Sequence, residues 1–244
     1  MRIAALSDIH GNLAALEAVL SDVAGREIDV IVNLGDIVSG PLWPAETATR
    51  LMALDLPTIA GNHERQLLTQ APDAMNASDA FAAARTDVKA KAWLAGLPPR
   101  MALCHDVLMV HGTPTSDIEH LLETIAPEGR RAASEGEVAA RLGDTPAGLV
   151  LCGHSHVPRA IRLADGRLVV NPGSVGLQAF ADDHPWPYIV EVGDPKARYA
   201  VLDDAGGRWS AEPIALDYDC HRAADRAAAN GREDWARALR TGRL

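Results

Sequence analysis

The stretch RIAALSDIHGNLAALEAVLSDVAG, residues 2–25, decides the fold class because a strand pattern passes directly into a helix pattern. The short apolar run 2–6 predicts a buried strand, and leucine and valine then recur at helical spacing over residues 13–23. Asn12 suits the N-cap of this helix, and Gly25 suits its end. The stretch therefore predicts the first strand and helix of a βαβ unit.

The strand–helix alternation continues over the next forty or so residues. DVIVNLGD, residues 29–36, predicts a second strand, and Pro44 can open a helix that runs to about Leu54. LPTIAGN, residues 56–62, predicts a third strand. Strands that alternate with helices favour an α/β fold with a parallel sheet.

The rest of the chain predicts helices, then mostly strands, then helices again. Residues 64–97 are helical in pattern, and residues 115–147 mix helix and loop. Strands are predicted in MALCHDVLMVHGTP, around a turn at His105–Asp106, and in GLVLCG, and Asp165–Gly166 predicts a hairpin. The later strand patterns are YIVEV, ARYAVLD and SAEPIAL. From about residue 220 the pattern is helical. We expect a single domain over 1–244, in which a helical excursion within about 64–147 could cap the site.

Composition narrows the class of partner. The 244 residues carry a formal net charge of -10, which disfavours a nucleic-acid polymer but not a small phosphorylated substrate. Three widely spaced cysteines form no pair that suggests a disulfide framework or a metal knuckle. The first residues lack the pattern of a signal peptide, and no apolar run approaches the length of a membrane span. We expect a cytoplasmic protein without membrane contact, and the sequence leaves its oligomeric state open.

Five short polar motifs stand where predicted strands end. They are SDIHG, LGD, GNHE, VHG and GHSH, and they contain Asp8, His10, Asp36, Asn62, His63, His111, His154 and His156. Each motif alone has a plain structural explanation as a turn or a cap. Together they bring five of the nine histidines to one predicted sheet edge, and clustered His and Asp are ligands for divalent transition metals. The remaining histidines, and Cys152 in its predicted strand, are expected to be structural: His105, His120, His184 and His221.

The spacing within the motifs has physical reasons. If the strand end is extended, residues i and i+2 face the same side, so Asp8 and His10 can face one ion while Ile9 packs into the core. Asn62 would bind through a neutral amide oxygen, which leaves the site positive enough to accept phosphate.

The ordered set D-x-H, GD, GNH-[D/E], H and GHxH over residues 7–156 resembles the calcineurin-like metallophosphoesterase superfamily. The match extends to NPGSVG, residues 171–176, which resembles a turn of small bacterial phosphoesterases, a group that includes diadenosine-tetraphosphatase-like members. The resemblance implies a four-layer αββα sandwich of two mixed β-sheets flanked by helices. We expect the NPGSVG turn to support the site rather than to take part in chemistry.

The resemblance also implies two metal ions and their ligands. One ion would take Asp8, His10 and His156, with Asp36 as a shared bridge, and the other would take Asp36, Asn62, His111 and His154. The GHSH segment would then be a loop around the metal pair, with Gly153 easing its turn. Manganese is the metal we favour, and iron, zinc and nickel would accept the same ligands.

By the same resemblance His63 is a catalytic residue rather than a ligand. It would lie beside the bound phosphate, which it contacts together with Asn62, and would protonate the leaving oxygen or stabilise charge in the transition state. Glu64, where many relatives carry aspartate, would orient His63. Many small relatives follow NPGSVG with a Pro-Arg pair, whereas this chain reads LQAFADDHPWPY, so a basic residue near the substrate is missing.

The function that follows is a metal-dependent phosphoesterase. It would hydrolyse a phosphomonoester or phosphodiester through a dinuclear metal centre and a bridging hydroxide, with a nucleotide or a phosphoprotein among its substrates. The alternative is a non-catalytic metal-binding scaffold of the same fold, against which the complete set of ligands and His63 argues. An unrelated nucleotide-binding α/β protein is disfavoured because no glycine-rich phosphate loop follows the first strand.

Overall fold

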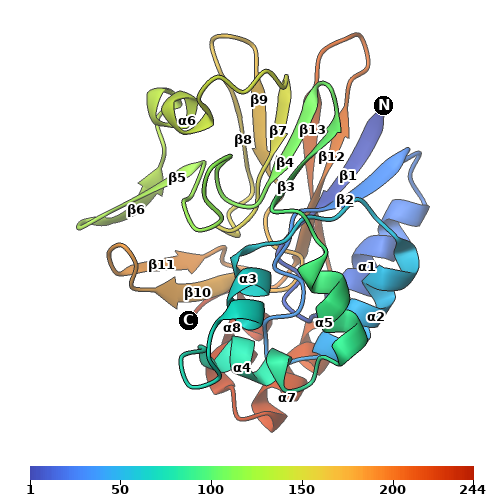
Figure 1. Cartoon of the computed structure of the whole chain (residues 1–244), viewed down its shortest axis with the longest axis vertical. Coiled ribbons are helices and arrows are strands. Elements are labelled where there is room, and N and C mark those ends of the chain that lie inside the picture. The colour runs from blue at the N-terminus through green and yellow to red at the C-terminus, as the bar shows by residue number, and fades with distance from the viewer.

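Two mixed β-sheets packed face to face form the centre of the molecule (Figure 1), in a computed structural model that describes residues 1–244. The first sheet has the order β13-β12-β1-β2, formed by Ser210–Leu216, Ala197–Asp203, Arg2–Leu6 and Val30–Asn33. The second has the order β3-β4-β7-β9-β8, formed by Arg100–Cys104, Val107–Val110, Leu149–Leu151, Leu168–Asn171 and Arg159–Arg162. Two ribbons stand apart, β5-β6 (Glu123–Ala126, Gly129–Ala132) and β10-β11 (Ala179–Asp182, Tyr188–Glu191).

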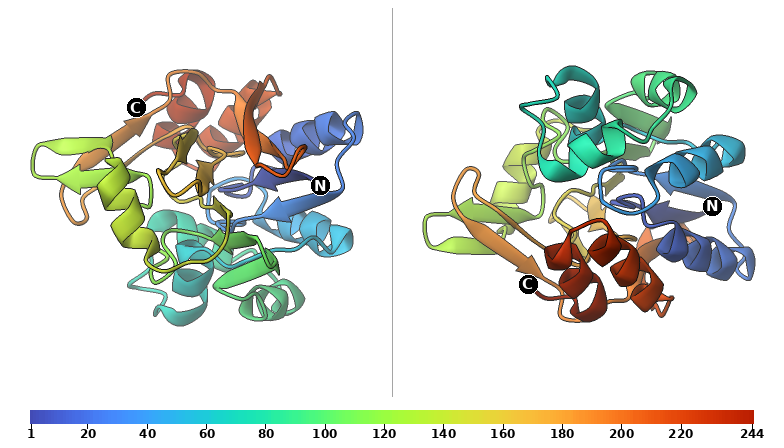
Figure 2. Two further views of the ribbon diagram at one scale, coloured as in Figure 1. Left: turned by 90° about the horizontal axis from the view of Figure 1, so that it is seen from above. Right: turned by 90° about the horizontal axis from the view of Figure 1, so that it is seen from below.

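The helices are α1 (Leu13–Ala24), α2 (Pro44–Leu54), α3 (Asn62–Thr69), α4 (Ala77–Ala83), α5 (Val88–Ala95), α6 (Glu135–Leu142), α7 (Cys220–Ala229) and α8 (Glu233–Thr241). Residues of α1 to α5 pack on the outer side of the first sheet and α6 packs on that of the second, whereas α7 and α8 pack on each other and on β10. Figure 2 shows α7 and α8, in red, opposite the teal helices α3 and α4. None of the helices has the length and hydropathy needed to cross a membrane.

The first strand explains why the sheets stack. Ile3 and Ala5 point into the core between the two sheets, whereas Ala4 and Leu6 point into the core shared with α1, α2 and α5. A strand buried on both faces needs an unbroken apolar run, as RIAAL provides. On the far side of the second sheet, Val150 packs with residues of α6 in a third core. The predicted four-layer αββα sandwich is confirmed.

One predicted strand does not form. Residues 56–62 contribute only a single bridge, at Thr58, to the edge of β2. Pro57 has no N–H to donate, and the N–H of Ala60 bonds to the carbonyl of Pro98 instead, 2.9 Å away. The segment therefore leaves the sheet after one residue and enters α3.

Most local predictions hold. The Asn12 side chain caps α1 through the N–H of Ala15, and the hairpin at Asp165–Gly166 joins β8 to β9. The excursion predicted within 64–147 is helical only in part, because β5 and β6 form a hairpin in the stretch 115–147 where helix and loop were expected. Residues from α3, α4 and the loop around Ser116 line the main cavity, whereas α6 packs on the outer face of the second sheet.

Candidate metal centre

The predicted ligands gather where strands of both sheets end. Asp8 and His10 follow β1, Asp36 follows β2, and Asn62 begins α3. From the second sheet, His111 follows β4 directly, and the loop after β7 carries the two histidines of the GHSH motif. The carboxyl edge of a sheet is where α/β folds bind ligands, because loops from neighbouring strands converge there.

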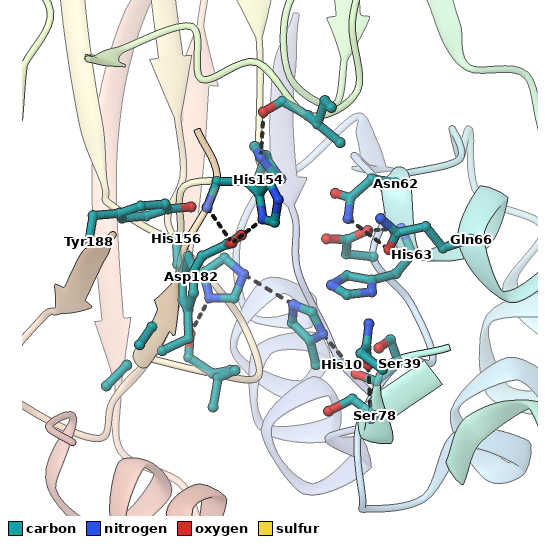
Figure 3. A pocket seen from close by; sticks show the side chains of 18 of the residues that line it. His10, Ser39, Asn62, His63, Gln66, Ser78, His154, His156, Asp182 and Tyr188 are labelled. Carbon is teal, nitrogen blue, oxygen red and sulfur yellow. Dashed lines mark hydrogen bonds and ion pairs between the residues drawn. The ribbon is translucent and has the colours of Figure 1, made fainter. Parts of the chain in front are cut away.

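Asp8, His10 and His156 form the first donor cluster, with one donor atom from each lying within 4.8 Å of the others. The Nε2 atoms of His10 and His156 are 3.0 Å apart, and Figure 3 shows the two rings pointing toward one another. Nε2 of His156 lies 3.4 Å from Oδ1 of Asp8. The structure thus brings together the three residues that the sequence analysis placed on one ion.

Asp36, His111 and His154 form the second cluster. Nε2 of His111 lies 3.1 Å from Oδ2 of Asp36 and 3.1 Å from Oδ1 of Asn62. The two clusters adjoin at Asp8, whose Oδ1 accepts a hydrogen bond from the backbone N–H of His154. Asp36 as the bridge between two ions remains a prediction.

Backbone carbonyls orient all four ligand histidines. Each ring has one nitrogen within 2.7 to 3.0 Å of a carbonyl oxygen: His10 Nδ1 with Ser39, His111 Nδ1 with Leu34, His156 Nδ1 with Leu177, and His154 Nε2 with Ile118. A carbonyl can only accept, so that ring nitrogen carries the hydrogen. The other nitrogen of each ring is then the one available to a metal ion.

The first cluster fits a cation on electrostatic grounds. Burial, and then the neighbouring His156, lower the pKa of His10 to about 4, so its ring is neutral and its Nε2 presents a lone pair. Two nitrogen lone pairs 3.0 Å apart repel unless a proton or a metal ion lies between them. Oδ2 of Asp8 is also buried without a hydrogen-bond partner. Unpaired donors of this kind suit a divalent transition metal.

The second cluster holds a proton that a metal would displace. Burial lowers the pKa of His111, but Asp36 more than offsets this and raises it to about 10. Burial alone would raise the pKa of Asp36, and the adjacent His111 holds it well below its usual value. Ligands must lose their protons to bind, so metal uptake here is coupled to proton release.

The backbone of the ligand loops is unusual. Of the six residues other than glycine with positive φ, five are ligand candidates with φ between 52° and 67°: Asp8, His10, Asp36, His154 and His156. Residues with a Cβ rarely adopt this backbone conformation, and those that do are often found at functional sites. Our expectation that the D-x-H motif forms an extended strand end is therefore wrong. The strand ends at Leu6, and left-handed turns aim Asp8 and His10 at one point while Ile9 stays buried.

Two glycines permit the close packing of these loops. A Cβ on Gly61 would lie 2.2 Å from Oδ1 of Asp36, and one on Gly153 would lie 2.0 Å from Oγ of Ser7. Gly153 does not have a positive φ, so the expected reason for it, an easier turn, is wrong. It is needed because the GHSH loop passes directly against the end of β1.

The NPGSVG turn braces the metal loops, as expected. Oγ of Ser174 and the N–H of Gly176 both donate to the carbonyl of Asp8, at 2.8 and 3.0 Å. Nδ2 of Asn171 donates to the carbonyl of Gly153 at 2.6 Å. The turn thereby ties the loop after β1 to the loop after β7.

Glu64 does not orient His63, contrary to the sequence prediction. Its carboxylate is fully buried and accepts the backbone N–H groups of Asp36, Ile37 and Gly61 at 2.8 to 2.9 Å. Glu64 faces this way because it is the third residue of α3, where a glutamate side chain reaches back over the helix start. It therefore holds the loop of Asp36.

Asp79 takes the role that was expected of Glu64. Its Oδ1 lies 2.8 Å from Nδ1 of His63, and its Oδ2 accepts from Nδ2 of Asn76. Burial lowers the pKa of His63, but Asp36 and then Asp79 raise it to about 9. Sequence reasoning missed Asp79 because it belongs to no motif. The Asn-x-x-Asp spacing that caps α4 was the available signal.

Two histidines expected to be purely structural lie close to the site. The ring of His120 is buried and stacks on His154, with centroids 4.6 Å apart, while its Nε2 lies 3.0 Å from the hydroxyl of Tyr188. His184 is exposed and lines the cavity. His120 thus fixes one face of a ligand ring. Cys152 is buried after β7 and belongs to neither donor cluster, as expected.

A cavity of about 1200 Å³ opens beside the two clusters. Asp36, Asn62 and His63 line it, together with His10 and the two histidines of the GHSH loop. Gln66 and Ser78, from α3 and α4, form part of another wall (Figure 3). A molecule bound in this cavity would contact both His63 and the donor clusters.

An αββα sandwich with adjoining histidine–aspartate clusters at one sheet edge is the arrangement of a metallophosphoesterase. The model of the calcineurin-like phosphoesterase superfamily domain matches residues 1–193, and the chain belongs to this superfamily. The helices α7 and α8 lie beyond the matched residues.

Similar proteins are known in bacteria and archaea. Uncharacterized protein MJ0912 of Methanocaldococcus jannaschii is 28% identical over 249 residues, which cover 96% of this chain and 94% of that protein. The crystal structure of a metallophosphoesterase from Sphaerobacter thermophilus has a TM-score of 0.77 and 28% identity, covering 99% of this chain and 100% of that one. Hypothetical protein PH1004 from Pyrococcus horikoshii OT3 has a TM-score of 0.76 and 21% identity, covering 99% and 98%, and shows the shared fold alone.

Proposed function

We propose that this protein is a metal-dependent hydrolase of phosphate esters. The observation that carries the proposal is the position of His63, an imidazole outside both donor clusters that lines the same cavity as they do. A non-catalytic metal scaffold needs the clusters but has no use for such a group. Membership of a phosphoesterase superfamily supports the same conclusion.

The chain's own residues account for binding and for proton transfer. When bound, two divalent ions would supply an activated water at neutral pH and neutralise the charge of the phosphate. Asn62 and His63 begin α3 at the cavity wall and would contact the phosphoryl group. His63 is held by Asp79 through Nδ1, so its Nε2 is the atom that would protonate the leaving oxygen.

The donor set narrows the choice of metal. All seven ligand candidates are imidazole, carboxylate or amide groups, and neither cluster contains a thiolate. Such ligands suit manganese, which we favour, and also iron, zinc or nickel. A cytoplasmic location accords with the three free cysteines.

A small phosphorylated molecule is the substrate that we propose, because the phosphate must reach donor atoms that are almost entirely buried. A nucleotide and a phosphorylated side chain of a protein both meet this requirement. A nucleic-acid polymer is not expected as a partner of a chain with a net charge of -10.

The direct test uses a monoester and a diester with the same leaving group. The protein, freed of metal and reloaded with manganese, should hydrolyse p-nitrophenyl phosphate, bis(p-nitrophenyl) phosphate or both, and chelation should abolish the activity. An Asp36→Asn variant purified in the same way should lose metal and activity together, and it serves as the control for a contaminating phosphatase. Two bound ions per chain without turnover of either substrate would instead support the non-catalytic scaffold.

A further inference from the structure

The cavity wall beyond the metal ligands is poor in positive charge. Apart from the ligands and His63, its lining includes three carboxylates, Glu119, Asp182 and Asp234, and a single guanidinium, Arg232. Figure 3 shows Asp182 and Tyr188 on the same side of the cavity as His156. A substrate bound beside the metal clusters shares the cavity with these charged groups.

Contacts within the protein already compensate the positive charge of Arg232, the single guanidinium. Nε and Nη2 of Arg232 lie 2.9 and 2.6 Å from the carboxylate of Asp234, and Nη1 donates to Oγ of Ser78 at 3.0 Å. Its planar group also lies 5.6 Å from the ring of Trp235. Arg232 thus joins α8 to α4, and its ion pair with Asp234 largely compensates its positive charge.

Asp182 has no lysine or arginine partner. Its Oδ1 accepts the backbone N–H groups of Asp183 and His184, at 2.6 and 3.1 Å, and the nearest basic group is the imidazole of His184 at 4.0 Å. Glu119 is half-exposed and lies 3.8 Å from Nε of Arg141. The wall therefore carries an excess of negative charge, of which Asp182 is the least compensated part.

Aromatic rings that line the cavity flank the metal-ligand histidines. The ring of Phe180 lies 4.7 Å from that of His156, and Trp235 lies 6.0 Å from His10. Tyr188 lies 6.0 Å from Phe180. Aromatic rings beside carboxylates attract cations and accept apolar groups, whereas polyphosphate chains need several free arginines or lysines.

We infer that the organic part of the substrate carries no negative charge, and that a cationic group such as a quaternary ammonium is preferred over its neutral counterpart. The inference rests on the proposed phosphoesterase function and names its substrate class. It disfavours polyphosphate substrates, whose additional charges would face Asp182 and Glu119 without a free guanidinium.

The test compares three p-nitrophenyl phosphodiesters whose second alcohol is choline, 3,3-dimethylbutanol or 4-hydroxy-2,2-dimethylbutanoate. These alcohols are similar in size but positive, neutral and negative, and the leaving group is the same in all three. If the protein accepts only monoesters, the three alkyl phosphates are compared by phosphate release. We expect kcat/KM to fall in the order positive, neutral, negative by about threefold to tenfold per step at low salt, and less in high salt.

Asp182→Asn removes the charge and keeps the Oδ1 acceptor for the two backbone N–H groups. The preference for choline over its neutral counterpart should fall at least twofold. Asp183→Asn is the matched control, because Asp183 is the adjacent acidic residue, exposed and outside the cavity lining. The preference of this variant for choline over its neutral counterpart should stay unchanged.

Hydrolysis of p-nitrophenyl phosphate or bis(p-nitrophenyl) phosphate distinguishes failure of this inference from failure of the proposed function. If the protein hydrolyses either ester but shows no charge preference, or prefers the negative ester, this inference is overturned and the proposed function stands. An equal change in Asp183→Asn would overturn the assignment to the cavity wall. If no phosphoester is hydrolysed by the metal-loaded protein, both claims fail.

Discussion

Nδ1 of His63 lies 2.8 Å from Oδ1 of Asp79, in a contact that joins the start of α3 to α4. The carboxylate is fully buried, and Nδ2 of Asn76 holds its other oxygen at 2.6 Å. A buried carboxylate fixed at both oxygens leaves the imidazole one orientation, with Nε2 as the atom available to a substrate. Asp79 can therefore position the His63 imidazole and favour its protonated form, which is the form that donates a proton.

His63→Ala should keep both metal ions and lose about 10²- to 10⁴-fold in kcat, the usual range for a general acid. The loss should be smaller for p-nitrophenyl phosphate than for an alkyl phosphate, because nitrophenolate departs without a proton. Steady-state kinetics on both esters, with metal analysis of the same samples, measure this. An equal loss on both esters would rule out the acid role.

Asp79→Asn should reduce kcat about 10- to 100-fold, the range for residues that orient a functional side chain. Asp79 raises the pKa of His63, so its removal lowers that pKa. A general acid acts in its protonated form, and activity is lost above its pKa, so the alkaline limb of the kcat profile should move to lower pH. In a chain that already carries His63→Ala, the Asp79 substitution should have no further effect on kcat. An additional loss there would show that Asp79 acts independently of His63.

Asp36→Asn should lower the metal content from two ions per chain to one or none, because a neutral amide replaces a carboxylate within the second cluster. Elemental analysis after dialysis gives the stoichiometry. Asp55→Asn is the matched control, because Asp55 also has positive φ but ends α2, outside both clusters. Two ions retained by Asp36→Asn would contradict the ligand assignment.

Metal should stabilise the fold. Bound ions would relieve the 3.0 Å contact between the Nε2 atoms of His10 and His156 and satisfy Oδ2 of Asp8. At a free concentration a hundred times Kd, one site adds about 2.7 kcal/mol. For a chain of this size that is a rise of about 5–10 °C in Tm. Calorimetry with and without manganese measures it, and an unchanged Tm in protein shown to bind the metal would refute the expectation.

Glu64→Gln should destabilise the metal-free protein by about 1–3 kcal/mol, because the amide group turns a donor toward backbone N–H groups that need an acceptor. Chemical denaturation measures the free energy of unfolding. Glu137 caps α6 in the same way but is only partly buried, so Glu137→Gln should cost less. If the two substitutions cost the same, burial of the Glu64 contacts is not what matters.

Local chemistry made much of the site readable from the sequence. Metals require imidazole and carboxylate side chains, and the order of the motifs along the chain identified the residues that the structure gathers into two clusters. The strand pattern placed these residues at sheet edges because buried strands need apolar runs such as RIAAL. The segment 56–62 shows the limit of such patterns. Its apolar residues favour a strand, but Pro57 and a competing carbonyl at Pro98 prevent it.

The sequence by itself determined the fold class and the types of side chain at the metal centre, because hydrophobic periodicity and ligand chemistry are properties of short segments. Only the tertiary structure decided which carboxylate holds His63, what Glu64 binds and how the ligand backbones turn. It also brought Arg232 and Asp234, beyond the motifs, to the cavity wall. These features depend on contacts between loops that approach within hydrogen-bonding distance. No local pattern encodes such contacts, because each depends on where the rest of the chain has already packed.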